Sequence, residues 1–391
     1  MNKDFVAIGV AQGDAFVVKR HDDFVALIDG GKSVAGFSTE FQRATNLDSV
    51  DVVVCTHNDA DHANGIIGFL QSGLHCKEVW LPASWADRLN DLFDPARFTH
   101  ELVDNLNGLR DAEIADIRDT DTFFKRLANG REANGIRDTE ESVDAEELAE
   151  RTREEDGGDY IELSRYPLLY WHPDWWFRRM RALRNDDPRF RLLIEAIAAG
   201  ERIKQIAQLA FHRGCRIRWF EYSDPNPSGG IPGKLVPVNA REVHEVKVSK
   251  SSALMYLALT ITNKQSLVLC SPQDGGAPAV LFTADSDLAF PNTVPWSDGM
   301  IITAPHHGSE ANAAAYQRFQ REMLNPVSTA WVRSDGRFKS RPGRWFLDLR
   351  GTNVPVFCTF CRGASRPKQD LVFTASGQSW NPVNTQSCSC R

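Results

Sequence analysis

Short apolar runs, separated by glycine, aspartate or proline, dominate residues 1–84 and 214–355 of the chain. Runs of this length and composition predict β-strands with turns at the polar breaks. In the first region we expect strands at 5–10, 15–19, 24–29, 50–55 and 78–81, and a helix at 66–71. In the second region and beyond it, we expect helices at 318–323 and 345–350 and strands at 215–219, 243–248, 254–262, 266–270, 279–284, 300–304, 330–332, 354–357 and 369–374.

Residues 85–213 show a different pattern, in which apolar residues recur near helical spacing among many charged ones. This periodicity favours helices, and we expect them at 86–93, 102–109, 123–127, 189–199 and 201–212. We therefore interpret 85–213 as a mostly helical, acidic insertion between two β-rich halves at 1–84 and 214–355, followed by a cysteine-containing tail at 356–391. Strands and helices that alternate in this way indicate an α/β fold.

The composition is that of a globular protein. The 391 residues include 42% hydrophobic and 25% charged side chains, so the chain can bury a full core. No apolar run reaches the roughly 18 residues that a membrane span needs, and the N-terminus lacks the apolar stretch of a secretory signal. We therefore expect a cytoplasmic protein without membrane association.

Charge is distributed unevenly along the chain. The net charge is −7, but residues 101–160 hold 19 acidic and 8 basic side chains, and residues 316–391 hold 12 basic and 4 acidic ones. A basic C-terminal region is compatible with a polyanionic substrate. An ordinary solvated surface would look the same.

The segment Thr56-His57-Asn58-Asp59-Ala60-Asp61-His62 carries the candidate chemistry, directly after the apolar run 52–55. Ionised aspartate is rarely buried unless it is paired or bound to a metal, and imidazole with carboxylate suits Zn, Mn or Fe. His57 and Asp59 lie two residues apart, so one turn can direct both at one ion. The adjacent Asp61 and His62 need a sharper turn to face a second ion. The alternative is a polar loop with an aspartate that caps the following helix.

This segment resembles the HxHxDH signature of the metallo-β-lactamase superfamily, in the HxDxDH form of its ComEC-like members. Four further segments resemble motifs of that family in the same order: Val10–Ala15 ("GqGDa"), Leu27–Gly31 ("liDgG"), Leu281–Asp285 ("LLtGD") and Ala304–Ser309 ("vpHHGS"). The resemblance covers residues 1–84 and about 215–360. It implies a four-layer αββα sandwich in which distant strand ends converge on a metal centre.

The resemblance also implies two divalent ions, Zn or Mn, and a ligand for each position. His57 and Asp59 would bind one ion, Asp61 and His62 would bind the other, and Asp285 would bridge both.

The two adjacent histidines of the last motif are assigned by resemblance alone. It suggests His307 as a ligand and His306 as an acid or a phosphate contact, although the sequence leaves the reverse assignment open. Asp61, Asp285 and His306 are thus the residues that we expect to act in catalysis. Asn263 and Lys264 are further candidates for stabilising a leaving group.

Two other aspartates are expected to support the centre. Asp29 would hydrogen-bond a ligand histidine and fix its tautomer. Asp14 would line the pocket, or serve only as a turn residue after Gly13. Many family members have a further histidine before the bridging aspartate, and none here is at a convincing strand end. A site with one ion is therefore an open alternative.

The tail contains a CxxC pair, Cys358 and Cys361, and a CxC pair, Cys388 and Cys390. Four thiols in two close pairs suggest a structural zinc site. Thiols without a ligand are the main alternative, and disulfides are a third.

These features predict a metal-dependent hydrolase that cleaves a phosphodiester in nucleic acid or a nucleotide, by means of a metal-activated water. Fold does not fix function, and two alternatives stay open. One is a hydrolase of small lactones or cyclic nucleotides. The other is a component of a multi-protein bacterial defence system that docks a protein partner through residues 85–213.

Overall fold

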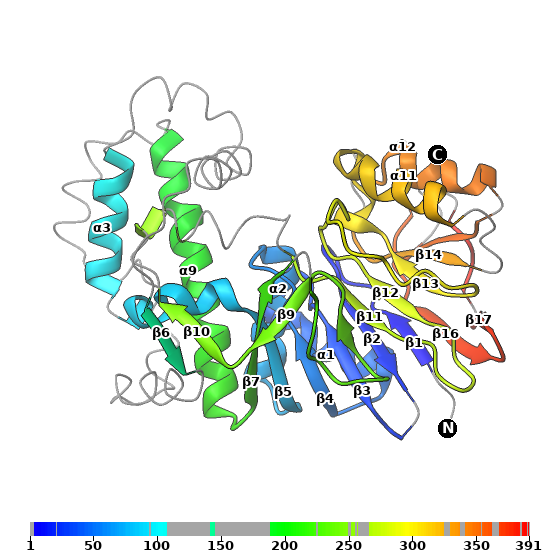
Figure 1. The fold of residues 1–391 in the computed structure, drawn as a ribbon, viewed down its shortest axis with the longest axis horizontal. Helices are drawn as coiled ribbons and strands as arrows, with labels where there is room; N and C mark the ends of the chain where they lie inside the picture. The colour runs from blue at the N-terminus through cyan, green and yellow to red at the C-terminus, as the bar shows by residue number, and fades with distance from the viewer. Residues whose placement is uncertain are drawn as a thin grey trace. The chain divides into compact units, whose positions relative to one another are not determined.

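The computed structural model describes residues 4–20, 22–93, 95–107, 141–144, 188–223, 226–248, 252–254, 256, 266–323, 329–336, 341–352, 354–361, 367–383, 385–388 and 390. The chain divides into two compact units, shown in Figure 1. Unit 1 consists of Met1–Pro82, Arg213–Glu242 and Asn263–Arg391, and unit 2 consists of Ala83–His212 and Val243–Thr262. The cysteine-containing tail clusters with unit 1, whereas residues 243–262 cluster with unit 2.

A nine-stranded sheet has the order β17-β16-β1-β2-β3-β4-β5-β7-β9. Its strands are β1 (Asp4–Ala7), β2 (Phe16–Lys19), β3 (Val25–Ile28), β4 (Ser49–Val54), β5 (His75–Pro82), β7 (Arg216–Tyr222), β9 (Ala240–Val243), β16 (Leu371–Ser376) and β17 (Ser379–Val383). From β3 to β7 the neighbours are parallel. The C-terminal ends of β3 and β4 therefore lie at the same edge of the sheet.

A six-stranded sheet has the order β15-β14-β13-β12-β11-β8. Its strands are β8 (Val236–Pro237), β11 (Leu269–Ser271), β12 (Val280–Phe282), β13 (Ile301–Thr303), β14 (Ala330–Arg333) and β15 (Val356–Cys358). β12, β13, β14 and β15 are parallel to one another. This arrangement again brings several C-terminal strand ends to one edge.

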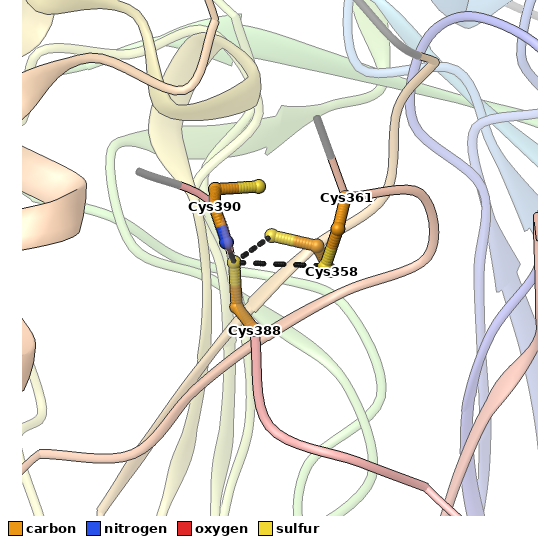
Figure 2. Close-up of side chains that lie close together, drawn as sticks. All are labelled: Cys358, Cys361, Cys388 and Cys390. Carbon is orange, nitrogen blue, oxygen red and sulfur yellow. Dashed lines mark hydrogen bonds between the residues drawn. The ribbon is translucent and has the colours of Figure 1, made fainter. Parts of the chain in front are cut away.

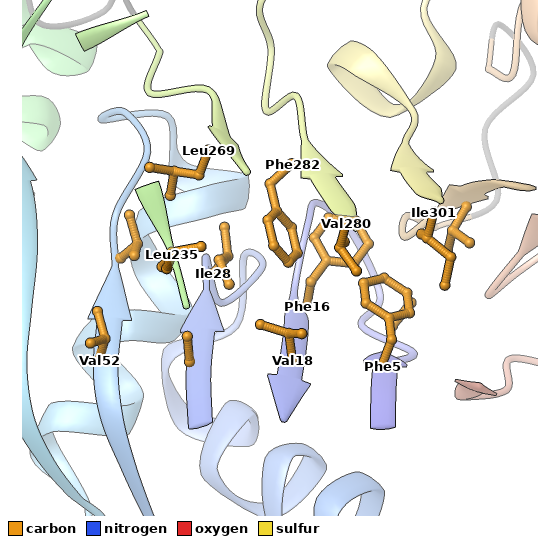
Figure 3. Packing of buried hydrophobic residues seen from close by; sticks show 14 of the residues in the cluster. Phe5, Phe16, Val18, Ile28, Val52, Leu235, Leu269, Val280, Phe282 and Ile301 are labelled. Atoms are coloured by element: carbon orange, nitrogen blue, oxygen red, sulfur yellow. The ribbon is translucent and has the colours of Figure 1, made fainter. Parts of the chain in front are cut away.

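The two sheets pack face to face through a shared apolar core, part of which Figure 3 shows. Phe5, Phe16 and Val52 from the larger sheet and Val280 and Phe282 from the smaller one are all buried in this cluster. Strand side chains alternate between the two faces. Buried Leu27 and Val53, which lie outside this cluster, therefore occupy the opposite face of the larger sheet.

Helices cover the outer faces of both sheets. α1 (Val34–Thr45) and α2 (Ala60–Gln71) connect the parallel strands β3, β4 and β5, and their Phe41 and Phe69 rings are 5.3 Å apart. On the smaller sheet, α11 (Ala313–Glu322) and α12 (Arg344–Asp348) pack in a second core with β-strand residues such as Ile302 and Trp331. Unit 1 is therefore an αββα sandwich, as expected from the sequence.

Unit 2 contains the 3₁₀ helix η1 (Ala83–Phe93), α3 (Pro95–Asn107), α9 (Pro188–His212) and a two-stranded sheet of β6 (Glu141–Asp144) and β10 (Glu245–Val248). The helix expected at 123–127 lies outside the described residues, as do Asn263 and Lys264. No helix among the described residues has both the length and the apolar character needed to cross a membrane.

Several expected elements differ from the structure. The helices expected at 189–199 and 201–212 form one continuous helix, α9, because the glycine between them, Gly200, is accommodated within it. The strand expected at 254–262 is wrong in its described part, since Ala253, Leu254 and Tyr256 are helical. A short apolar run does not distinguish a buried strand from a buried helix. Helix α1 was not expected, although Ser33 caps it by accepting a hydrogen bond from Gly36 N.

Candidate metal centre

Side chains from distant parts of the sequence meet where strands of both sheets end. His57 and Asp59 follow β4, and Asp285 follows β12. Asp61 and His62 lie in the first turn of α2. Asp59 is the N-cap residue of that helix, yet its side chain makes no capping hydrogen bond. Capping therefore does not account for the Asp59 carboxylate.

The backbone turns sharply at several of these strand ends. Asp29 after β3 has φ 57°, and Ala284 after β12 has φ 47°. His306 and His307, in the 3₁₀ turn η4 (Pro305–Gly308) after β13, have φ 47° and 54°. Non-glycine residues with positive φ are uncommon, and they cluster at functional sites. The turns of η4 separate the directions of two histidines that are adjacent in sequence.

The Asp285 carboxylate lies at the middle of the cluster, and its oxygen Oδ1 faces two imidazoles. His62 Nε2 is 3.1 Å from Oδ1, and His307 Nε2 is 3.9 Å from it. The two Nε2 atoms are 3.2 Å apart, and Asp61 Oδ2 lies 3.4 Å from His307 Nε2. Ligands that lie about 2.0–2.2 Å from one tetrahedral ion are about 3.3–3.6 Å from one another, close to these distances. One cation could therefore sit among these groups.

The other oxygen, Asp285 Oδ2, faces a different pair of histidines. His57 Nε2 and His306 Nε2 each lie 3.6 Å from Oδ2. Asp59 Oδ2 is 3.7 Å from His57 Nε2. Asp285 thus presents one oxygen to each of two groups of potential ligands, which is the arrangement that a bridging carboxylate requires.

Asp29 and Thr56 contact one imidazole of each group, on the ring nitrogen that faces away from Asp285. Asp29 Oδ2 is 2.8 Å from His62 Nδ1 and accepts a hydrogen bond from Thr56 Oγ1, while Asp29 Oδ1 accepts one from Thr56 N. Thr56 Oγ1 is also 3.0 Å from His57 Nδ1. A carboxylate on Nδ1 holds the proton there and leaves Nε2 available to a metal.

Asp14 plays the same part for His307, since its Oδ1 lies 2.9 Å from His307 Nδ1. Gly13 makes this approach possible, because a Cβ at Gly13 would lie 1.6 Å from the carbonyl oxygen of Asp61. Asp14 Oδ2 and His57 Nε2 are buried and have no hydrogen-bond partner among the described residues. Buried polar atoms are nearly always satisfied, so these two atoms fit ligands of a cation.

Two groups of side chains could therefore hold metal ions. Asp14, His62, Asp285 and His307 are buried, and each brings one potential ligand atom within 4.8 Å of the others. His57, Asp59 and Asp285 also bring potential ligand atoms within 4.8 Å of one another, with Asp59 half-buried. Mixed imidazole and carboxylate donors suit Zn or Mn.

Asp285 and the imidazoles of His57, His62 and His307 shift one another's pKa values in opposite directions. Burial opposes the charge on His57, but Asp285 and Asp59 outweigh it and raise the pKa of His57 to about 9. Burial also opposes the charges on His62 and His307, yet nearby aspartates hold both of their pKa values well above the usual one. In turn, and against burial, the imidazoles hold the pKa of Asp285 well below its ordinary range.

His306 behaves differently from the other imidazoles. Asp285 attracts a proton to it, but burial and the positive charges of His307 and Arg341 outweigh this attraction and lower the pKa of His306. A quarter of its side chain, 25%, is exposed. His306 is therefore a neutral, accessible imidazole at the edge of the cluster.

Metal binding is expected to release protons. The pKa values of His57, His62 and His307 are raised, to about 9 for His57. Without a metal, these imidazoles are therefore in the charged, doubly protonated form at pH 7.5. A metal ligand must be deprotonated. We expect release of about one proton or more per chain at pH 7.5, and fewer as the pH rises through about 9. Calorimetric titration with Mn²⁺ in buffers of different ionisation enthalpy measures this number, and an enthalpy that does not depend on the buffer contradicts it.

The variant Asp29→Asn is expected to weaken metal binding about 10–100-fold. Asparagine tolerates the left-handed backbone at this position. If its oxygen accepts from Thr56 N, its amide faces His62 Nδ1, and the imidazole proton moves to Nε2, which faces Asp285. Titration with Mn²⁺ measures the affinity, and the exposed Asp104→Asn in unit 2 serves as the control. Unchanged affinity in Asp29→Asn would show that Asp29 does not orient a ligand.

The histidines and aspartates expected from the sequence lie in this cluster, and the four cysteines form a separate one. Asn263 and Lys264 lie outside the described residues. Sequence reasoning did not find Thr56, Arg333, Asp335 or Asn312. Arg333 Nε donates to His307 O, and Asp335 Oδ1 accepts from Gly13 N. Asn312 donates to the backbone of Asp285. Only Thr56 had a visible signal, its position directly before His57 at a strand end.

Comparison with known families supports this description. A family model described as "Metallo-beta-lactamase superfamily" matches residues 8–121. The match includes the first three motifs, while Asp285, His306 and His307 lie outside it. No curated protein matches the sequence. The family match and the buried cluster of histidines and aspartates together indicate a metal-dependent hydrolase.

Proposed function

We propose that this protein is a phosphodiesterase of the ComEC-like type, acting on nucleic acid or a nucleotide with two divalent ions, Zn or Mn. The supporting observation is the placement of Asp285, whose two oxygens face two separate groups of ligands. Asp61, His62 and His307 would hold one ion with Asp285 Oδ1, and Asp14 brings one carboxylate oxygen within 4.8 Å of the ligand atoms of His62, Asp285 and His307. His57 and Asp59 would hold the other ion with Asp285 Oδ2.

Bound divalent ions would polarise the scissile phosphoryl group and lower the pKa of the attacking water. The protein supplies the remaining parts. Asp29, Thr56 and Asp14 fix the orientation of the ligand imidazoles. His306 is accessible and close to Asp285, so it is placed to contact the substrate. Its lowered pKa supports a role as a phosphate contact or an additional ligand rather than as a general acid at neutral pH.

Cationic side chains beside the cluster support a phosphoester rather than a neutral ester. The charge of Arg341 acts on His306. Lys32 is exposed, and its Nζ donates to Gln12, whose amide in turn donates to Asp61 Oδ2. Arginine and lysine in these positions can neutralise phosphate oxygens.

A substrate panel with the purified full-length chain tests the proposal. Labelled single-stranded and double-stranded DNA, RNA, cyclic nucleotides, a bis-aryl phosphodiester and a lactone are each incubated with Mn²⁺ or Zn²⁺. We expect cleavage of phosphodiesters, with polymer binding that weakens as salt rises. Cleavage of the lactone alone would replace the proposal with a small-molecule hydrolase. No cleavage of any substrate would instead favour a docking component.

Variants of two cationic residues beside the site test whether these side chains contact the phosphate. Arg341→Ala and Lys32→Ala are expected to raise KM for phosphodiesters about tenfold, because each would remove a cation placed to contact phosphate, worth about 1.4 kcal/mol. Arg341 Nε also pairs with Asp335 Oδ2 at 3.4 Å, so Lys32→Ala is the simpler of the two variants. Lys77→Ala removes an exposed lysine that pairs with Asp51 on β4 and is the matched control. Equal effects in all three variants would show that general surface charge, not the site, binds the substrate.

A further inference from the structure

A second cluster of potential metal ligands lies in unit 1, formed by Cys358, Cys361, Cys388 and Cys390. Figure 2 shows the four side chains pointing toward one another. All four are buried, and their Sγ atoms lie within 4.8 Å of one another. Cys358 ends β15, and Cys361 follows it in a turn. The tail returns alongside this strand, where Cys388 N donates to Val356 O.

The distances suit a shared ion better than sulfur–sulfur bonds. Cys388 Sγ lies 3.0 Å from Cys358 Sγ and 3.8 Å from Cys361 Sγ. A disulfide requires about 2.05 Å. Four sulfurs at about 2.3 Å from a tetrahedral zinc ion are separated by about 3.8 Å. The 3.8 Å pair matches this spacing, and the 3.0 Å pair needs to open by less than 1 Å.

The surroundings of the cluster can balance a thiolate site. Four thiolates and one Zn²⁺ carry a net charge of −2, which is costly in a buried place without compensation. Arg333 is fully buried, and Cys358 and Cys390 are among the groups that act on its charge. Arg350 donates to the carbonyl oxygens of Cys388 and Cys390. Cys390 N also donates to Cys388 Sγ, at 3.3 Å.

The turn between Cys358 and Cys361 is connected to the candidate metal centre through Arg333 and Asp335. Thr359 N donates to Arg333 O, and Thr359 Oγ1 accepts from Asp335 N. Arg333 Nη1 donates to Phe360 O, while its Nε donates to His307 O.

The second branch of this connection runs through Asp335. Arg333 Nη2 is 2.6 Å from Asp335 Oδ2, and Asp335 Oδ1 accepts from Gly13 N. Gly13 is adjacent to Asp14, which holds His307 Nδ1. The CxxC turn therefore supports His307 from two sides.

We propose that Cys358, Cys361, Cys388 and Cys390 bind one structural zinc ion, which fastens the tail to β15 and positions His307 through Arg333 and Asp335. The zinc ion here is structural, because four protein ligands leave no open position. Only the positioning of His307 rests on the proposed function; the zinc site itself does not.

Zinc content measured by plasma mass spectrometry tests the site on the full-length chain. The variant Asp285→Ala is dialysed against EDTA first, so that no ions of the Asp285 centre contribute to the measured metal. We expect the dialysed Asp285→Ala variant to retain about one zinc ion per chain. The double variant Cys388→Ser/Cys390→Ser should lose this zinc ion. Cys76→Ser replaces a half-buried thiol outside the cluster and is the matched control. Absence of zinc from Asp285→Ala, or equal zinc in the double cysteine variant, would overturn the proposal.

Cobalt substitution gives a second measurement if the cysteine variant fails to fold. Asp285→Ala produced with Co²⁺ is expected to show the intense visible bands of tetrahedral cobalt and thiolate-to-cobalt charge-transfer bands in the near ultraviolet. Their absence, or a mass after thiol alkylation that reports disulfides among the four cysteines, would contradict the zinc site.

The positioning role has its own readout. In the double cysteine variant we expect Mn²⁺ affinity at the Asp285 centre to fall about 10–100-fold, the range typical of lost support behind a ligand. Unchanged Mn²⁺ affinity would show that the zinc site holds the tail on β15 but does not position His307. A zinc site in a protein without phosphodiesterase activity would refute the proposed function alone, and activity without zinc would refute this inference alone.

Discussion

The variant Asp285→Ala is expected to lose both divalent ions of the candidate centre and at least about 1000-fold in kcat/KM, or about 4 kcal/mol of transition-state stabilisation. Asp285 is buried, and its two oxygens face His62 on one side and His57 on the other. Without this carboxylate, neither group of ligands is complete. The variant also removes the negative charge that would offset the charge of a cation bound among the buried imidazoles.

Metal content and phosphodiester turnover are measured together on this variant. Asp298→Ala is the matched control, since Asp298 is exposed in the same connection between β12 and β13. A variant at Asp285 that keeps both its metal and its activity would show that the strand-end cluster is not the catalytic centre.

Replacing the two adjacent histidines is expected to have unequal effects. His307 is buried with Nε2 facing His62 and Asp61, so His307→Ala should remove one ion and reduce turnover about 100–1000-fold, as the loss of a central electrostatic group does elsewhere. His306 is partly exposed, and its Nε2 lies 3.6 Å from Asp285 Oδ2. His306→Ala should therefore keep the ion held by His62 and lower kcat about 10–100-fold, because one hydrogen bond to a charged phosphate contributes about 1.5–3 kcal/mol.

Titration with Mn²⁺ and a full kinetic analysis separate the two variants. Both substitutions remove an imidazole from the same turn, so each controls for the other. If His306→Ala loses the metal and His307→Ala retains it, the two roles are reversed.

Local sequence predicted much of the fold and most of the candidate ligands. The strands expected at 15–19, 24–29 and 50–55 correspond to β2, β3 and β4 with small shifts at their ends. Their short apolar runs end in glycine or aspartate, where the chain turns. The segment from His57 to His62 stood out because four potential ligands follow a buried strand, which packing does not explain.

Other features depend on contacts that no local pattern reports. The roles of His306 and His307 follow from two successive left-handed residues in η4, and sequence alone does not show them. Arg333 donates to His307 O from more than 20 residues away in the sequence. Asp335 accepts from Gly13 N from more than 300 residues away. Gly200 resembled a helix end, but α9 continues through it because burial of its apolar side chains outweighs the cost of one glycine.

Anomalous X-ray diffraction from crystals grown with Zn²⁺ or Mn²⁺ locates the ions and shows whether Asp285 lies between two of them. We predict one peak between Asp285 Oδ1 and the Nε2 atoms of His62 and His307, and a second beside Asp285 Oδ2 and His57. Crystals that contain the metal but show no anomalous peak within coordination distance of Asp285 would show that this cluster is not a metal centre.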